Sequence, residues 1–138
     1  MSNLELIRLL LDAGLLVLIW MVQLVVYPSF RFYQKENLLR WHQLYTQRIS
    51  YVVLPLMLGQ IVVAGLQVWE QQTWMTSLSF GIVFSLWAMT FLVFVPLHNK
   101  IANDTYDSNS LAQLVAKNWW RTVLWTLVFL LSLKAQLF

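Results

Sequence analysis

The chain contains only two histidines, and both lie where a long apolar stretch meets polar residues. His42 lies within RWHQLY, and His98 within VPLHNK. Imidazole side chains can ligate a haem iron, transfer protons or bind a polar head group, and they can also simply cap helix ends. The residue types leave the chemistry open, so the elements that position the two rings must decide it.

Composition places the chain among integral membrane proteins. Hydrophobic residues make up 59% of the 138 residues and charged residues 11%, whereas about a quarter of the residues are charged in soluble domains. This length accommodates one transmembrane domain, 1–138, so function must lie in its helices or short loops. No cysteine is present, which excludes disulfides, thiolate metal sites and thiol relays, so redox chemistry would require a bound cofactor.

Apolar stretches predict an all-α, four-helix membrane bundle. The first helix is expected at about 4–27, ending before Pro28, and the second at 35–69. The second would be ~52 Å long at ~1.5 Å per residue. Because the hydrocarbon core is only ~30 Å thick, this helix must extend beyond the membrane on the cytoplasmic side.

The other two helices are expected at 74–98, with Pro96 near its end, and at 111–136. The capping-box pattern SLAQ, which begins at Ser110, predicts the start of the last helix. Its uncharged run is too short to span a membrane, so the side chain of Arg121 is expected to extend to the interface. In the first helix, Arg8 and Asp12 have the spacing of a local ion pair.

The distribution of Lys and Arg predicts the orientation. Most Lys and Arg residues lie in the first and third predicted loops and their flanks, whereas the side that holds both termini carries only Arg8 and Lys134. Both termini should therefore lie outside, with the first and third loops in the cytoplasm, in a bacterial inner membrane. The basic residues of these loops and their flanks mark topology rather than a nucleic-acid site, and they are Arg31, Lys35, Arg40, Arg48, Lys100, Lys117 and Arg121.

This topology brings polar residues from all four helices to the cytoplasmic face. His42 and His98 are the candidate acid and base, with Tyr45 beside them. Arg121 would offset negative charge on a ligand. The remaining candidate ligand-binding residues are Gln23, Tyr27, Thr46, Asn99, Asn118 and Thr122. No metal site is expected, and the same residues can alternatively be ordinary interfacial anchors.

The segment VPLHNKIA, at the end of the third predicted helix, resembles the small four-helix membrane proteins of the DUF1772 or anthrone-oxygenase-like group. That group has a Val-Pro-x-Asn-Asn-type segment after helix three, and His98 replaces an expected asparagine here. The resemblance implies oxidation of an activated aromatic or other lipophilic substrate, with His42 or His98 as the base.

Four functions fit these patterns. The first is binding, and possible oxidation or other transformation, of a lipophilic small molecule at the cytoplasmic face. The second is a haem- or quinone-linked redox protein, with haem b held by His42 and His98. The third is a non-catalytic accessory subunit of a larger membrane complex, in which Gly59 and Gly65 allow close helix contacts. The fourth is a channel or transporter, which would require a homo-oligomer to supply the pore.

Overall fold

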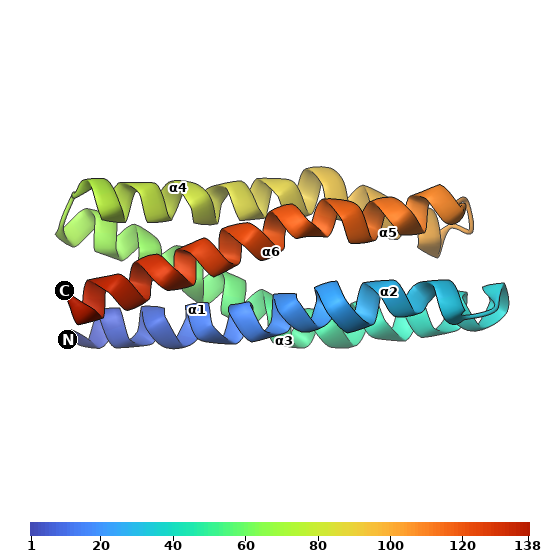
Figure 1. Ribbon diagram of the computed structural model, residues 1–138, viewed down its shortest axis with the longest axis horizontal. Helices are drawn as coiled ribbons and strands as arrows, with labels where there is room; N and C mark the ends of the chain where they lie inside the picture. The colour runs from blue at the N-terminus through green and yellow to red at the C-terminus, as the bar shows by residue number, and fades with distance from the viewer.

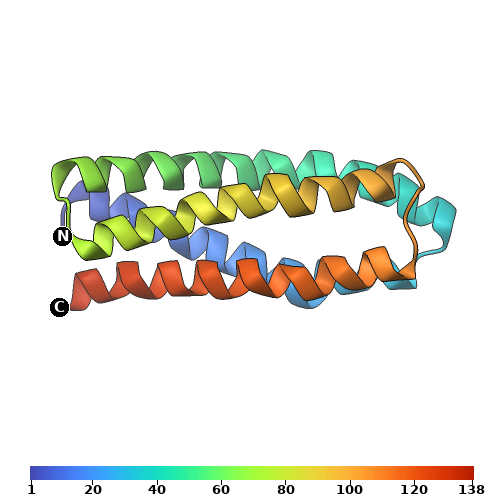
Figure 2. The same ribbon diagram turned by 90° about the horizontal axis from the view of Figure 1, so that it is seen from above.

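The computed structural model describes residues 1–138 as four helical segments that run alternately up and down (Figures 1 and 2). Both termini lie at one end of the bundle, together with the loop between the second and third segments. The other two loops, 33–34 and 103–107, lie at the opposite end, which we call the loop end.

Two of the four segments are interrupted by short π-helical or 3-10 turns, so each consists of several elements. The first segment contains α1 (Asn3–Met21), the π-helical η1 (Val22–Val26), α2 (Tyr27–Ser29) and the 3-10 turn η2 (Phe30–Phe32). The third segment contains α4 (Trp74–Met89), the π-helical η3 (Thr90–Phe94) and α5 (Val95–Ala102). The second segment is α3 (Lys35–Glu70), and the fourth is α6 (Ser108–Leu137).

Pro28 does not end its helix, contrary to the sequence-based boundary, and the helix that contains Pro96 extends beyond its predicted end at 98. The first segment continues to Phe32 and the third to Ala102. In each segment a π turn ends just before the residue that precedes the proline. The backbone N–H of Tyr27 bonds the carbonyl of Val22, and that of Val95 bonds the carbonyl of Thr90, so both bonds reach five residues back. Such a turn adds a residue to the helical repeat, and each proline then occupies the first turn of a new α-helical element, where its missing N–H is tolerated.

The π turn in the first segment also shifts the buried stripe around the helix. The stripe follows Leu15 and Ile19 of α1 to Val22, the first residue of η1. From Gln23, also in η1, it continues through Tyr27 and Phe30, one residue later than regular α-helical spacing predicts. The Tyr27 side chain is therefore directed into the bundle.

The start of α6 also differs from the prediction. Asp107 is the N-cap, and Ser110 is the third helical residue of the capping box rather than its cap. The Asp107 carboxylate accepts a hydrogen bond from the Ser110 N–H at 2.8 Å. This bond, with the one from the Ser110 hydroxyl, lowers the pKa of Asp107 below its usual value of 3.8. The helix α3, expected at 35–69, runs from Lys35 to Glu70, and Pro55 lies within it without ending it.

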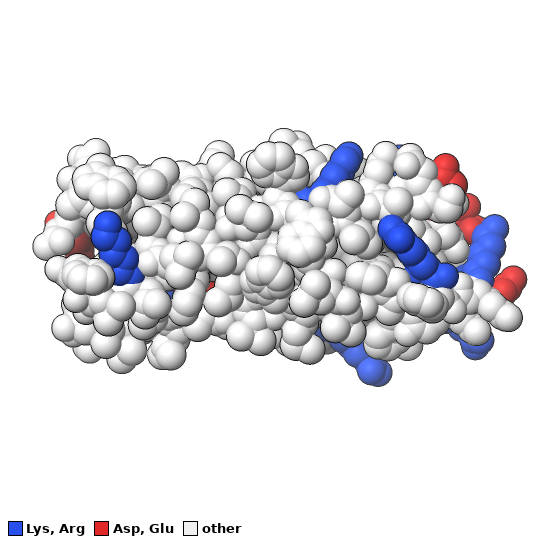
Figure 3. All heavy atoms as spheres, viewed as in Figure 1, with Lys and Arg blue, Asp and Glu red and all other residues white.

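Three segments are long and apolar enough to cross a membrane: Asn3–Phe32, Lys35–Glu70 and Trp74–Ala102. The surface view shows a broad uncharged band, with most Lys and Arg side chains toward the loop end (Figure 3). The fourth segment, α6, is outside this group but packs along both α1 and α4. The four segments therefore share one apolar core.

The Arg8–Asp12 ion pair expected from the sequence is present, and both side chains are buried in the core. Arg8 Nε donates to the two carboxylate oxygens of Asp12 at 2.9 and 3.0 Å. The Arg8 side chain also donates to Gln67 of α3 at 3.1 Å and to Ser79 of α4 at 2.6 Å. One arginine of α1 is thus bonded to the second and third segments as well.

The Asp12 carboxylate completes this cluster from its other side. It accepts hydrogen bonds from Gln60 of α3, at 2.7 Å, and from the Ser132 hydroxyl of α6. Gln60 in turn accepts from the Trp125 indole of α6 at 3.2 Å. This carboxylate and its partner Arg8 thus bond residues of all four segments, so the cluster holds the segments together.

We expect Asp12→Ala to lower the free energy of unfolding by about 3–5 kcal/mol, because it leaves the Arg8 charge buried without its partner. The double variant Arg8→Met/Asp12→Leu should recover most of this loss, since it removes both charges. Unfolding by denaturing detergent measures both, with Glu70→Ala at the exposed end of α3 as the control. A loss in the double variant as large as in Asp12→Ala would contradict this role.

Candidate functional site

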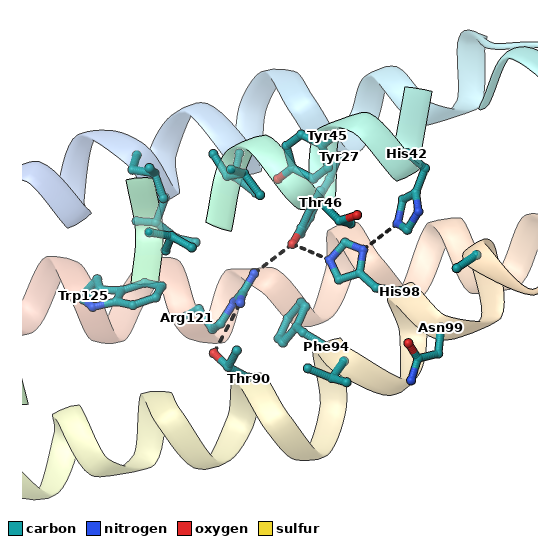
Figure 4. Close-up of a pocket in the computed structure, with 17 residues that line it drawn as sticks. Tyr27, His42, Tyr45, Thr46, Thr90, Phe94, His98, Asn99, Arg121 and Trp125 are labelled. Atoms are coloured by element: carbon teal, nitrogen blue, oxygen red, sulfur yellow. Dashed lines mark hydrogen bonds between the residues drawn. The ribbon is translucent and has the colours of Figure 1, made fainter. Parts of the chain in front are cut away.

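Four side chains near the loop end form a continuous line of hydrogen bonds (Figure 4). His42 Nε2 lies 2.8 Å from His98 Nδ1, and His98 Nε2 lies 3.0 Å from the Tyr27 hydroxyl. That hydroxyl accepts a hydrogen bond from Arg121 Nη2 at 3.0 Å. Each residue comes from a different helical segment, so the line exists only in the folded bundle.

Local structure explains how each member reaches the line. Tyr27 is the first residue after η1, and His98 lies in the first turn of α5 after η3, so the two π turns set both directions. His42 lies in the second turn of α3, only 1% exposed, with the Phe30 ring against it edge to face. The two imidazoles are stacked, with ring centroids 5.0 Å apart.

Arg121 is buried at 7% exposure and points into the bundle, so the expectation that it extends to the membrane interface is wrong. Its guanidinium lies over the Phe94 ring, 3.6 Å from the centroid. It also donates to the oxygens of Asn118 at 2.9 Å and Thr90 at 3.4 Å. All these partners, including Tyr27, are formally neutral groups.

No carboxylate accompanies this buried cation. The ion pairs of the chain are Arg8–Asp12 and Lys35–Asp104, and neither involves Arg121. Three of the five guanidinium N–H groups are used by the protein, which leaves two for another acceptor. An unpaired charge in an apolar interior is costly, and an anion beside Arg121 would lower this cost.

A second layer of amides and hydroxyls holds Arg121 in place. Gln23 Oε1 accepts from Asn118 Nδ2 at 2.9 Å and from the Thr122 hydroxyl at 3.0 Å. These bonds orient the Asn118 amide so that its oxygen faces Arg121. Gln23, Asn118 and Thr122 were expected to contact a ligand, but they lie behind Arg121 and do not line the cavity described next.

Beside the hydrogen-bonded line lies a cavity of about 300 Å³. Its inner wall is closed by buried residues of α1 and α6, including Ile19 and Trp125. Its outer rim includes Val95, Asn99 and Ala102, which are exposed on α5 and face α3 across the opening. The cavity therefore opens sideways between α3 and α5. Besides these five residues and the line itself, it is lined by Leu18, Val22, Tyr45, Thr46, Ile49, Val53, Thr90 and Phe94.

This lining combines an apolar chamber with polar groups gathered at one wall. None of the lining residues is Asp or Glu, and Arg121 is the one side chain among them with a permanent charge. Nowhere in the chain do three or more His, Asp or Glu side chains come together as a metal-binding group. The arrangement suits a molecule with an apolar body and an oxygen-containing head group.

The two histidines are not placed as axial ligands of a haem. Their nitrogens are 2.8 Å apart and bond directly to each other. Two nitrogens on opposite faces of one metal are separated by about 4 Å, twice a metal–nitrogen bond of ~2 Å. The observed contact does not fit that geometry.

Most of the expected site residues do come together. His42, His98, Tyr45, Tyr27, Thr46, Asn99 and Arg121 all line the cavity. Sequence reasoning missed Thr90 and Phe94, although Thr90, Phe94 and His98 follow one another at the i,i+4 spacing of a helix face. It predicted the Arg8–Asp12 pair but missed the cluster around it. The polar residues Gln60, Gln67 and Ser132 in the same half of the bundle were the available signal.

Comparisons of the chain with protein families, with curated proteins and with solved structures found no match.

The two buried arginines should respond differently to neutralisation. We expect Arg8→Gln to lower the free energy of unfolding by about 3–5 kcal/mol, because Asp12 then loses its counter-charge. Arg121→Gln should cost less than about 1 kcal/mol, because it removes an uncompensated charge while an amide can still bond its neighbours. Unfolding of the purified, ligand-free variants in the same detergent measures both, and an equally large loss in Arg121→Gln would contradict the absence of an anionic partner.

Proposed function

We propose that this protein is an integral membrane protein that binds an amphipathic small molecule in the lateral cavity, with the molecule's acidic oxygen at Arg121. The observation that carries the proposal is the buried guanidinium without a carboxylate, with two N–H groups left over beside a largely apolar chamber. The contrast with Arg8 supports it, since that arginine has the same number of bonded N–H groups but is paired with the carboxylate of Asp12.

The shape of the cavity supports a lipophilic ligand. Its opening between α3 and α5 lies on the side of the bundle, so a molecule dissolved in the bilayer reaches it without crossing water. Ile49 and Val53 on α3 and Val95 on α5 offer apolar contacts near this opening. A carboxylate, phenolate or enolate suits the planar donor pattern of Arg121.

The membrane setting is part of the proposal. The three long apolar segments and the uncharged band support insertion of the bundle across a bilayer. The excess of Lys and Arg near the loop end favours a cytoplasmic location for the cavity, with both termini outside a bacterial inner membrane. The first turns of α3, including His42, would then lie near the cytoplasmic head groups.

Acid–base chemistry on the bound head group is the activity that the site supports best. Tyr27 and His98 both donate or accept protons and lie beside Arg121. A quinone-linked role remains compatible, because a quinol is itself a lipophilic phenol. The accessory-subunit alternative gains nothing from Gly59, because a Cβ there would lie 3.2 Å from Leu11 of the same chain.

Extraction of the protein from its native membrane in mild detergent should yield a lipophilic acid, phenol or enol bound in a reproducible ratio. We expect Arg121→Gln to retain less than about a tenth of it, because loss of a charge-assisted hydrogen bond costs about 1.5–3 kcal/mol. Mass spectrometry of the extracted small molecules measures this. Arg48→Gln, at an exposed position of α3, is the matched control. Equal recovery from Arg121→Gln and the unaltered protein would contradict the proposal.

Single cysteines test the orientation cleanly, because the chain has none of its own. Ser2→Cys should react with a membrane-impermeant maleimide in intact cells. Thr105→Cys, in the loop before α6, should react only after the cells are broken. The opposite labelling pattern would place the cavity on the outer side of the membrane.

A further inference from the structure

The hydrogen bonds along the line from Arg121 to His42 can be arranged in two ways, which differ in which atom of each pair donates. Arg121 only donates, so the Tyr27 oxygen accepts from it in both. In the first arrangement, Tyr27 donates to Nε2 of His98, and Nδ1–H of His98 donates to Nε2 of His42. In the second, Nε2–H of His42 donates to Nδ1 of His98, Nε2–H of His98 donates to the Tyr27 oxygen, and the Tyr27 hydroxyl hydrogen is free to point into the cavity.

These two arrangements contain the same number of protons, and every residue has the same charge in both. To pass from the first to the second, Tyr27 gains a proton from the cavity while its own moves to His98. The Nδ1 proton of His98 moves to His42, and the proton on Nδ1 of His42 leaves. One proton thus enters at Tyr27 and one departs at His42.

The far end of the line is Nδ1 of His42. Nδ1 of His42 is buried and has no hydrogen-bond partner in the protein, unlike its neighbours along the line. Buried polar atoms normally have a partner, so this atom is suited to exchange a proton with water that reaches it. Lys35, the first residue of α3, lies at the loop end, and His42 lies about 10 Å from it along the helix.

The surroundings leave few other paths for a proton. Tyr45 of α3 is the other titratable group that lines the cavity, and Arg121 of α6 is the charged one. No carboxylate faces the line from any of the helices packed around it. An anion in the cavity is therefore stabilised by Arg121, and its proton has Tyr27, His98 and His42 as acceptors.

We propose that Tyr27, His98 and His42 form a proton relay that ionises a weakly acidic lipophilic hydroxyl compound, such as a phenol, as it binds. The O–H bond of the ligand breaks, its electron pair stays on the oxygen beside Arg121, and one proton leaves from His42 toward the loop end. This inference rests on the proposed function and adds the chemical class of the ligand. A carboxylic acid ionises near pH 4 and needs no relay, whereas a phenol ionises near pH 10 and arrives neutral.

An alkyl-substituted para-nitrophenol tests the relay, because its phenolate absorbs at longer wavelength than the phenol. It is added to the purified full-length protein in detergent, at a pH at which empty micelles hold it as the phenol. We expect the bound probe to show the phenolate band and to release one proton per molecule to a water-soluble pH dye. The methyl ether of the probe should bind without releasing a proton.

The variants separate the relay from the anion site. Arg121→Gln should lose the phenolate band. His98→Gln and His42→Gln should keep it but slow its appearance and the proton release by about 10²-fold in stopped-flow measurements, the range of a lost acid–base group. Tyr27→Phe should slow both processes in the same way, and its control Tyr51→Phe, exposed on α3, should match the unaltered protein.

Nitrogen-15 NMR of the unaltered protein gives a second test that does not depend on how the variants fold. With only two histidines, the ring signals are few, and binding of the probe should move the hydrogen of His42 from Nδ1 to Nε2. A probe that stays a phenol when bound, an unchanged rate in His98→Gln, or unchanged ring signals would overturn the relay. Absence of probe binding, or equal affinity in Arg121→Gln, would instead overturn the proposed function.

Discussion

Every polar side chain buried between these helices must find its partner within the bundle, because an apolar surrounding offers none. Arg8 meets this requirement with a carboxylate, Asp12, and with residues of α3 and α4. Arg121 meets it only in part, through neutral oxygens and the face of the Phe94 ring. The same requirement thus leaves a charge-paired cluster in one half of the bundle and a buried arginine without a carboxylate in the other.

The two π turns connect this requirement to the geometry of the site. Each precedes a proline by two residues, and each shifts the buried face of its helix before the functional residue. Tyr27 and His98 meet because both segments contain such a turn at a comparable depth. A helix that ended at the proline would have left His98 beyond its last turn, without the rigid support that proton transfer over 3 Å distances requires.

The cavity places these groups where an apolar molecule can reach them. Its inner wall, around Trp125, is held by Gln60, which also bonds Asp12. The Arg8–Asp12 cluster and the candidate site are therefore connected through the hydrogen bond between Gln60 of α3 and Trp125 of α6. The back wall of the cavity is thus buried and hydrogen-bonded, whereas its rim on α5 is exposed.

The sequence by itself determined the all-helical class, the long apolar segments and the extent of α3, because these follow from local composition and apolar run length. It also brought His42, His98, Tyr27 and Arg121 to one end, because alternating helices fix which ends are neighbours. Only the tertiary structure decided that the first helix passes through Pro28 and that a π turn lies before each of Pro28 and Pro96, since local composition does not predict a π turn. It also decided that Arg121 faces inward without a carboxylate, because the direction of a side chain depends on the helices packed against it.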